Sequence, residues 1–334
     1  MPSLFLAART GPLVLPRVVG LLALATGLLG LLPSCSKDNN STAATPSKIT
    51  VPQRALSPEG IQYDEANQRF IVSSRTQGRI GTVRDDSTYT LLADDIRLVS
   101  TIGLNLDASR QRLLAAVSDA VANTNNRSTP TTLRKLAALA IFNPSSGALL
   151  SYIDLGVLRP TQAHFANDIA VDAQGNAYIT DSLSPIIYKV DAQGVATVFL
   201  ENTQLSGGTG FGLNGIVYHP DGYLLVAKSN DGTLYKVPIA NPTGFTAVTS
   251  SQSLVGADGM LLLDNTTLLV VAGSQNTVFR MASTDAWATT RPSGSFATGA
   301  VSATTITRCN TSDAFVLYPY TATAPRFAIT KAVF

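Results

Sequence analysis

Four short segments of this sequence begin with a residue whose side chain offers an oxygen ligand. The lead residues are Glu59, Asn167, Asn214 and Asp258, and each precedes Gly or Asp and then a short alternating apolar stretch. Two carboxylates and two amides form an all-oxygen set with two formal negative charges, which suits Ca²⁺ or another divalent cation. Asn, Asp and Gly also cap strands and turns, so a metal site requires a fold that brings the four residues together.

The elements around these residues repeat along the chain. In each segment the apolar stretch is followed by a turn, a second apolar stretch, another turn and a third stretch, which indicates antiparallel strands. Two weaker copies complete the set, and the first of them carries a polar insertion at 123–132. The copies begin near residues 59, 103, 167, 214, 258 and 304. Apart from the unit with the insertion, their spacing is about 45 residues, which is typical of a β-propeller.

The sequence therefore predicts an all-β fold, a six-bladed β-propeller over residues 49–334. A β-sandwich is the main alternative, but its strands would not recur at fixed offsets. Equivalent positions in successive blades converge on the central channel, so we expect the four lead residues to share one rim. Residues 48–53 form a spare strand-like piece. We expect this piece to complete the last blade and close the ring, because closure removes an exposed sheet edge.

The first 35 residues have the pattern of an export signal. Arg9 and Arg17 give a positive leader before an apolar stretch at 18–32. This stretch is shorter than the roughly 20 residues of a bilayer span. The Leu-Pro-Ser-Cys sequence that follows resembles a bacterial lipobox, so we expect a signal peptide that ends at a lipidated Cys35. A signal-anchor helix with an incidental cysteine is the alternative. Residues 36–48 are polar and aperiodic, which predicts a flexible tether.

Composition and charge narrow the partners. The formal net charge is +2 and Lys and Arg are scattered along the chain, which argues against a nucleic-acid partner. The presence of only two histidines, His164 and His219, argues against a multi-histidine zinc or iron site. His219 lies in a Tyr-His-Pro-Asp-Gly turn and is expected at the surface. The lipobox resemblance implies a bacterial cell-envelope protein held on the membrane by its lipid, with Ser36 favouring the outer membrane. We expect a monomer.

The four lead segments resemble the senescence marker protein/gluconolactonase/luciferin-regenerating enzyme family, and within it the calcium-dependent phosphotriesterase-like proteins. The likeness spans residues 55 to about 285 and rests on Glu-Gly-Ile (59–61), Asn-Asp-Ile-Ala-Val-Asp (167–172), Asn-Gly-Ile-Val-Tyr-His-Pro-Asp-Gly (214–222) and Asp-Gly-Met (258–260). This resemblance implies a six-bladed propeller with one catalytic divalent ion on its axis, held by Glu59, Asn167, Asn214 and Asp258. It also implies hydrolysis of lactones, esters or organophosphates. Asp258 is expected to act as base or nucleophile, and Glu59 is expected to be the second catalytic residue.

One position departs from that family. Its sugar-lactonase members carry Arg two residues before the Asn-Asp pair, whereas this chain has Phe165, so a more apolar lactone or ester is favoured as substrate over an aldonolactone. His164 is a candidate for the channel mouth, either as a proton shuttle or as a rim residue without a catalytic part. The alternative function is a non-catalytic binding or scaffold propeller of the cell envelope with a structural calcium ion, because a fold alone does not define an activity.

Overall fold

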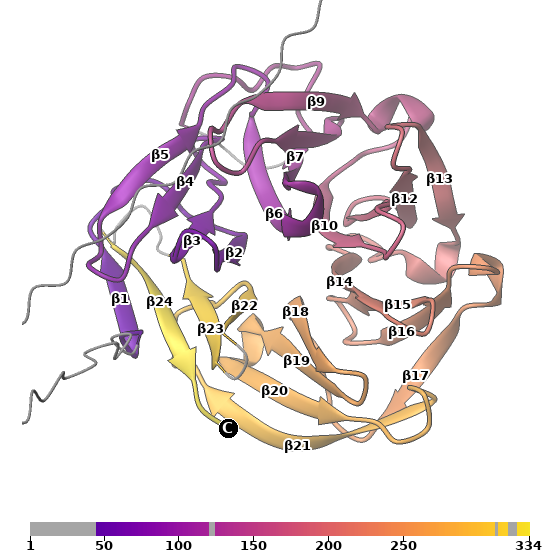
Figure 1. Ribbon diagram of the computed structural model, residues 1–334. Coiled ribbons are helices and arrows are strands. Elements are labelled where there is room, and N and C mark those ends of the chain that lie inside the picture. Colours follow the sequence, from indigo (N-terminus) through magenta and orange to yellow (C-terminus); the bar gives the residue numbers. More distant parts are fainter. Residues whose placement is uncertain (1–44, 120–123, 311–312, 320–325) are drawn as a thin grey trace, which may run out of the picture. The chain divides into compact units, whose positions relative to one another are not determined.

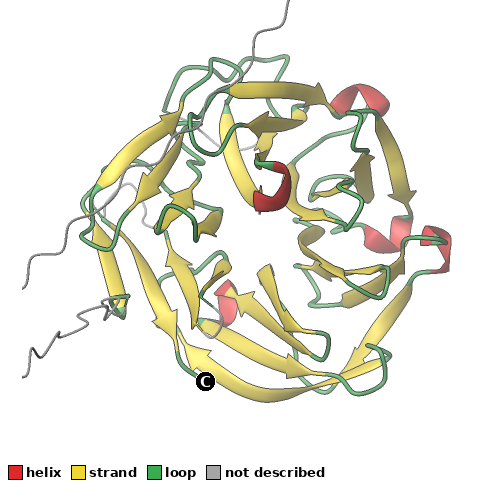
Figure 2. Ribbon diagram, in the orientation of Figure 1, coloured by secondary structure: helices red, strands yellow, loops and turns green. Residues whose placement is uncertain are grey.

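The computed structural model describes residues 45–119, 124–310, 313–319 and 326–334. The expected signal peptide, the lipidation site at Cys35 and most of the expected tether therefore lie outside the described residues. Residues 45–334 form one compact unit. Its antiparallel sheets are arranged around a central channel, and the described helices are short 3-10 turns (Figures 1 and 2). The predicted all-β, propeller-like fold is confirmed.

The strands form four layers that lie at increasing distance from the channel. The innermost layer holds β2 (Ile61–Asp64), β6 (Ser100–Asp107), β10 (Ala166–Val171), β14 (Leu213–His219), β18 (Ala257–Asp264) and β22 (Ile306–Cys309). The second layer holds β3 (Arg69–Val72), β7 (Arg112–Ser118), β11 (Ala177–Asp181), β15 (Tyr223–Lys228), β19 (Thr267–Ala272) and β23 (Asp313–Tyr318). The third holds β4 (Ile80–Val83), β8 (Ala137–Phe142), β12 (Ile186–Val190), β16 (Leu234–Pro238), β20 (Thr277–Ala282) and β24 (Phe327–Ala332).

The outermost layer consists of edge strands, and short 3-10 helices lie in the connections. The edge strands are β5 (Tyr89–Ala93), β9 (Leu149–Asp154), β13 (Ala196–Glu201), β17 (Thr246–Ser250), β21 (Thr289–Ala297) and β1 (Lys48–Val51). The 3-10 helices are η1 (Ala108–Arg110), η2 (Gly156–Leu158), η3 (Thr203–Leu205), η4 (Pro242–Gly244) and η5 (Gly273–Gln275). Among the described residues, no helix is long and apolar enough to cross a membrane.

Pairing of the strands gives five sheets. Four of them have four strands, in the orders β2-β3-β4-β5, β6-β7-β8-β9, β10-β11-β12-β13 and β1-β24-β23-β22. The fifth has eight strands in the order β14-β15-β16-β17-β21-β20-β19-β18. Two meanders merge in this sheet because the edge strands β17 and β21 pair in parallel, with Thr249 opposite Thr289 and Ser250 opposite Thr290. The sequence repeat did not indicate this pairing between neighbouring units.

The N-terminal strand closes the ring, as expected. β1 pairs antiparallel with β24, from Lys48 opposite Thr330 to Val51 opposite Phe327, and lies beside it in Figure 1. The side chains of Ile49 and Val51 are buried in a cluster that contains residues of both the last and the first sheets, including Phe315 and Phe70. The strand therefore joins the two ends of the chain through its hydrogen bonds and through its apolar face.

The hydrophobic core lies between neighbouring sheets. One cluster, for example, packs Tyr178 and Ile187 of one sheet against Leu224 and Val226 of the next. Strands of the second layer are covered on both faces, and every residue of β15 and β19 is buried. Continuous apolar stretches such as Thr-Leu-Leu-Val-Val-Ala in β19 follow from this double burial. The packing holds the six inner strands in fixed positions around the channel.

Candidate functional site

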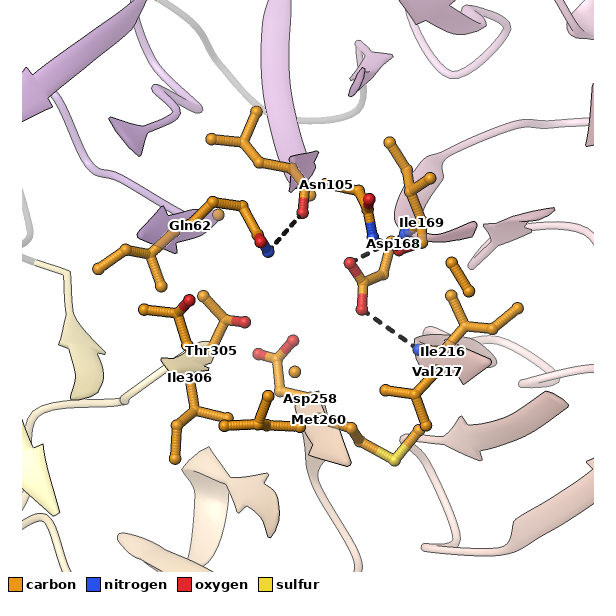
Figure 3. Close-up of a pocket in the computed structure, with 18 of the residues that line it drawn as sticks. Gln62, Asn105, Asp168, Ile169, Ile216, Val217, Asp258, Met260, Thr305 and Ile306 are labelled. Atoms are coloured by element: carbon orange, nitrogen blue, oxygen red, sulfur yellow. Dashed lines mark hydrogen bonds between the residues drawn. The ribbon is translucent and has the colours of Figure 1, made fainter. Parts of the chain in front are cut away.

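The inner strands enclose a cavity of about 400 Å³ at the centre of the ring. Glu59, Asn167, Asn214 and Asp258 all line it. The structure thus brings the four lead residues together, although they come from four different units of the repeat. In Figure 3 the Asp258 carboxylate points into the open centre of this cavity.

Irregular strand pairing orients three of these four side chains toward the cavity. The register shifts between Ala166 and Ile169 in β10, between Leu213 and Ile216 in β14, and between Ala257 and Met260 in β18. Asn167, Asn214 and Asp258 each lie inside one of these shifts. A β-bulge of this kind redirects a side chain, and its repetition explains why equivalent lead residues face one cavity.

Glycine after the lead residue lets the inner strands approach closely. A Cβ atom on Gly60 would lie 2.4 Å from the Ile102 carbonyl oxygen, and one on Gly215 would lie 2.2 Å from the Asp258 carbonyl oxygen. Neither distance leaves room for a side chain without moving the backbone of the next unit. Ser73 Oγ also accepts hydrogen bonds from the backbone N–H groups of Glu59 (3.3 Å) and Gly60 (2.7 Å). These contacts fix Glu59 at the entrance to β2.

Two buried oxygen atoms at this site have no hydrogen-bond donor among the described residues. They are Oε2 of Glu59 and Oδ1 of Asn214. The amide nitrogens of the asparagines are engaged: Asn167 Nδ2 donates to Ser182 Oγ at 2.9 Å, and the Asn214 amide donates to the Asp258 carboxylate. The amide donors of Asn167 and Asn214 are therefore satisfied, whereas two acceptors of the site have no hydrogen-bond partner. A buried acceptor without a partner is costly, and a cation would satisfy it.

Negative charge is concentrated here. Burial raises the pKa of Asp258 well above its usual range, and the carboxylates of Glu59 and Asp168 raise it further. Burial also raises the pKa of Glu59, which the Arg75 guanidinium partly opposes. In the described residues, no three His, Cys, Asp or Glu side chains form a metal-binding group. A cation at this site would thus depend on the amide oxygens of Asn167 and Asn214 as well as on the carboxylates.

Asp168 is a cavity residue that the sequence reasoning missed. Its carboxylate points into the cavity (Figure 3) and accepts the backbone N–H groups of Ile169 at 2.9 Å and Ile216 at 3.2 Å. Burial raises the pKa of Asp168 to about 7. The signal was present in the repeat, since Gly60, Gly215 and the residue after Asp258 are all glycine, whereas Asp168 is the exception. Asp168 links β10 to β14 next to two of the lead asparagines.

His164 and Phe165, the candidates for the channel mouth, are not among the residues that line this cavity. His164 is 1% exposed, its Nδ1 lies 2.7 Å from Asp181 Oδ2, and its Nε2 lies 2.9 Å from the carbonyl oxygen of Arg159. Both ring nitrogens are therefore engaged in a buried network, which leaves none for a proton shuttle at the channel mouth. Phe165 is also buried, and its ring packs on Phe211 with 5.1 Å between centroids.

His219 corrects another expectation, because it is buried rather than at the surface. Its side chain is 1% exposed and stacks on Tyr223 with ring centroids 4.2 Å apart. Its Nε2 lies 2.9 Å from the carbonyl oxygen of Asn265, in the next unit of the repeat. The turn that contains His219 therefore packs against the corresponding turn of the next unit, which contains Asn265. His219 is part of the contact between these two units.

Other polar side chains in the cavity bridge the inner strands. Gln62 Nε2 donates to the Leu104 carbonyl at 2.9 Å, and Asn105 Nδ2 donates to the Ile169 carbonyl at 3.1 Å (Figure 3). Arg308 donates to the carbonyl oxygens of Leu262 and Leu263. The donors of these three side chains hydrogen-bond the backbone of neighbouring inner strands. The unpaired oxygens of Glu59 and Asn214 differ from them in this respect.

Comparison with solved structures gives the fold class: the chain has the propeller fold found in gluconolactonases and luciferin-regenerating enzyme. The major Malassezia sympodialis allergen Mala s 1 aligns with a TM-score of 0.68 at 18% identity, over 87% of this chain and 97% of that chain. XC5397 from Xanthomonas campestris, described as a gluconolactonase, aligns with a TM-score of 0.59 at 18% identity, over 86% and 89%. Luciferin-regenerating enzyme aligns with a TM-score of 0.57 at 11% identity, over 84% and 94%.

These likenesses establish the fold, and the resemblance that the four lead segments suggested is confirmed at that level. No protein-family model matches the chain, and no curated protein sequence is significantly similar to it. At identities of 11–18% the shared property is the propeller architecture. An activity therefore has to be argued from the side chains of the cavity.

Proposed function

We propose that this protein is an exported, lipid-anchored hydrolase of lactones or esters that uses calcium or another divalent cation in the central cavity. The observation that supports it is the convergence of Glu59, Asn167, Asn214 and Asp258 on one cavity, with two buried oxygens that lack a donor. In this proposal the fold counts as six-bladed, with the eight-stranded sheet as two blades joined through β17 and β21.

The proposed substrate is a small, rather apolar lactone or ester. Fold neighbours described as gluconolactonases support the lactonase class of reaction. The chain has Phe165 where the sugar-lactonase members of the resembling family carry Arg, which favours a substrate with fewer hydroxyl groups than an aldonolactone. Phe165 does not line the central cavity and is buried against Phe211, so no guanidinium group at this position can bind a sugar hydroxyl group.

The residues of the cavity have separate roles in this proposal. Glu59, Asn167, Asn214 and Asp258 would hold the cation, which when bound supplies Lewis-acid polarisation of a substrate carbonyl and offsets the negative charge that develops on it. Asp258 either removes a proton from the attacking water or attacks the carbonyl itself, and the two routes differ in whether a covalent acyl-enzyme forms. The hydrogen bond from Asn214 orients the Asp258 carboxylate.

The alternative is a binding or scaffold propeller of the cell envelope with a structural cation. The side chains of Gln62, Asn105 and Arg308 favour it, because they use the cavity to tie inner strands together. A cation between Glu59 and Asp258 would extend the same role by joining the first unit to the fifth. In that case the cation would raise stability and no substrate would be turned over.

A panel of lactones, aryl esters and phosphotriesters separates these functions. The panel is assayed with the protein that lacks residues 1–35, in the presence of Ca²⁺ and again in the presence of chelator. We expect calcium-dependent turnover of at least one lactone or ester. If the calcium-loaded protein hydrolyses no compound of the panel, while calcium still raises its melting temperature, the scaffold function replaces the hydrolase.

A further inference from the structure

A guanidinium group lies next to the lead carboxylate of the cavity. Arg75 Nη1 forms an ion pair with Glu59 Oε2 at 3.5 Å, but Oε2 accepts no hydrogen bond from the described residues. The Arg75 side chain is 36% exposed, yet its Nε is buried and has no acceptor in the part of the chain that the structure describes. An unpaired donor therefore lies beside an unpaired acceptor.

The position of Arg75 does not depend on Glu59. Arg75 Nη2 donates to Ser57 Oγ at 3.0 Å, and the Arg75 backbone N–H donates to the Ser57 carbonyl at 3.2 Å. Ser57 itself has a φ of +40°, in the left-handed region that non-glycine residues rarely occupy. Such backbone strain persists only where the surroundings impose it, and it is concentrated at ligand sites. The loop thus holds the guanidinium in place at the edge of the site.

The unpaired groups call for two ligands of opposite charge. Oε2 of Glu59 and Oδ1 of Asn214 need a cation or a donor, whereas Nε of Arg75 needs an acceptor. Once Glu59 binds a cation, Arg75 faces a like charge at short range, which is unfavourable unless an anion lies beside both. A carboxylate suits this place best, because Arg binds carboxylates through paired N–H donors.

We propose that Arg75 is a specificity-determining residue that binds a carboxylate of the substrate. The inference rests on the proposed hydrolase function and narrows its substrate class. The preferred compounds are esters or lactones with a carboxylate close to the scissile carbonyl and an otherwise apolar body. Arg75 supplies the charge recognition beside Glu59, which lines the cavity.

A matched pair of probes tests this assignment without requiring turnover. Phenylacetate and phenylacetamide have almost the same shape, but only phenylacetate carries a charge. Their binding to the calcium-loaded protein is measured by isothermal titration calorimetry for the wild type, Arg75→Gln and Arg75→Lys. Arg97→Gln is the control, since Arg97 forms its ion pair with the surface residue Asp95 and not with Glu59. Repeating the titrations with chelator gives the contribution of calcium.

We expect the wild type to bind phenylacetate at least about tenfold more tightly than phenylacetamide, and Arg75→Gln to lose that preference. Arg75→Lys should keep part of the preference, and Arg97→Gln all of it. Unchanged phenylacetate affinity in Arg75→Gln would assign carboxylate binding to the calcium ion and overturn the role of Arg75, as would the absence of phenylacetate binding to the wild type. Loss of the hydrolase function alone, with Arg75-dependent phenylacetate binding retained, would leave this assignment intact.

Discussion

The side-chain amide of Asn214 donates a hydrogen bond to the carboxylate of Asp258, so a residue of β14 holds a residue of β18 at the cavity. The oxygen of the same amide is buried and accepts no hydrogen bond from the described residues. One side chain thus orients the proposed base or nucleophile and offers a ligand to a cation. This relationship places the two residues in one functional unit and leads to distinct expectations for the two carboxylates of the site.

Asp258→Asn and Glu59→Gln should differ in whether calcium rescues them. Both variants remove a charge from the proposed cation site, so both should bind calcium more weakly. At saturating calcium, Glu59→Gln should recover most of its turnover, whereas Asp258→Asn should stay roughly 10²–10⁴-fold slower because it lacks the base or nucleophile. Steady-state kinetics over a calcium titration measures both effects. Full recovery of Asp258→Asn would remove its catalytic role.

Asp168→Asn should destabilise the protein. The two oxygens of Asp168 accept one N–H each from Ile169 and Ile216, and an asparagine would place an N–H₂ group against one of these donors. Leaving a buried donor unpaired costs about 1–3 kcal/mol. Urea unfolding in the presence of chelator measures this loss, with Glu65→Gln as the control at an exposed carboxylate. Equal unfolding midpoints for the wild type and Asp168→Asn would show that this bridge between β10 and β14 contributes nothing.

His164 should make stability depend on pH. Burial alone would lower its pKa, but the hydrogen bond and charge of Asp181, with the hydrogen bond to the Arg159 carbonyl, outweigh burial and raise the pKa above its ordinary value of 6.5. The folded state therefore binds the proton more tightly than the unfolded state. Its contribution is fully present below about pH 6.5 and is lost as pH rises through the raised pKa of the folded state.

Urea unfolding of the wild type and His164→Gln between pH 5.5 and pH 9 measures this contribution. We expect the gap in unfolding free energy between the two proteins to narrow as the pH increases. A gap of constant size across this range would mean that His164 keeps the same protonation state in the folded and unfolded proteins.

Deletion of the N-terminal strand should open the ring. Removing residues 36–44 leaves β1 and the hydrogen bond from the Lys331 N–H to the Ser47 carbonyl intact, so stability should hardly change. Extending the deletion to residue 53 removes β1 and exposes the pocket of Ile49 and Val51, each worth roughly 1.5–3 kcal/mol of burial. Calorimetric melting of the two truncated proteins measures the difference. Identical melting temperatures would show that β1 does not stabilise the ring.

Membrane attachment should depend on Cys35. The lipobox-like Leu-Pro-Ser-Cys sequence precedes this residue, so the mature protein is expected to begin at an acylated Cys35 and to fractionate with the outer membrane. Cys35→Ser should release it from the membrane fraction. Mass spectrometry of the N-terminal peptide identifies the modification directly, and an unmodified N-terminus upstream of Cys35 would exclude lipidation.

Features that repeat along the chain could be predicted from the sequence. The lead residues Glu59, Asn167, Asn214 and Asp258 recur at one position of a strand pattern, so a ring of such units must bring them to the same cavity. The spare strand at 48–53 was predictable for a similar reason, because a meander of three strands leaves a free edge that a fourth strand can cover. In both cases the periodic strand pattern along the sequence is enough to predict where the residues lie in the fold.

Contacts between units were decided by the tertiary structure. Asp168 accepts a hydrogen bond from the N–H of Ile216 in the next unit, and β17 pairs with β21 across a boundary that the repeat does not mark. Within the first unit, Arg75 approaches Glu59. His164 likewise contacts Asp181 of the adjacent strand β11. The sequence by itself determined which residue types occupy the equivalent positions. Only packing of the sheets determined which side chains meet, because partners distant in the sequence are set by inter-sheet geometry and not by local periodicity.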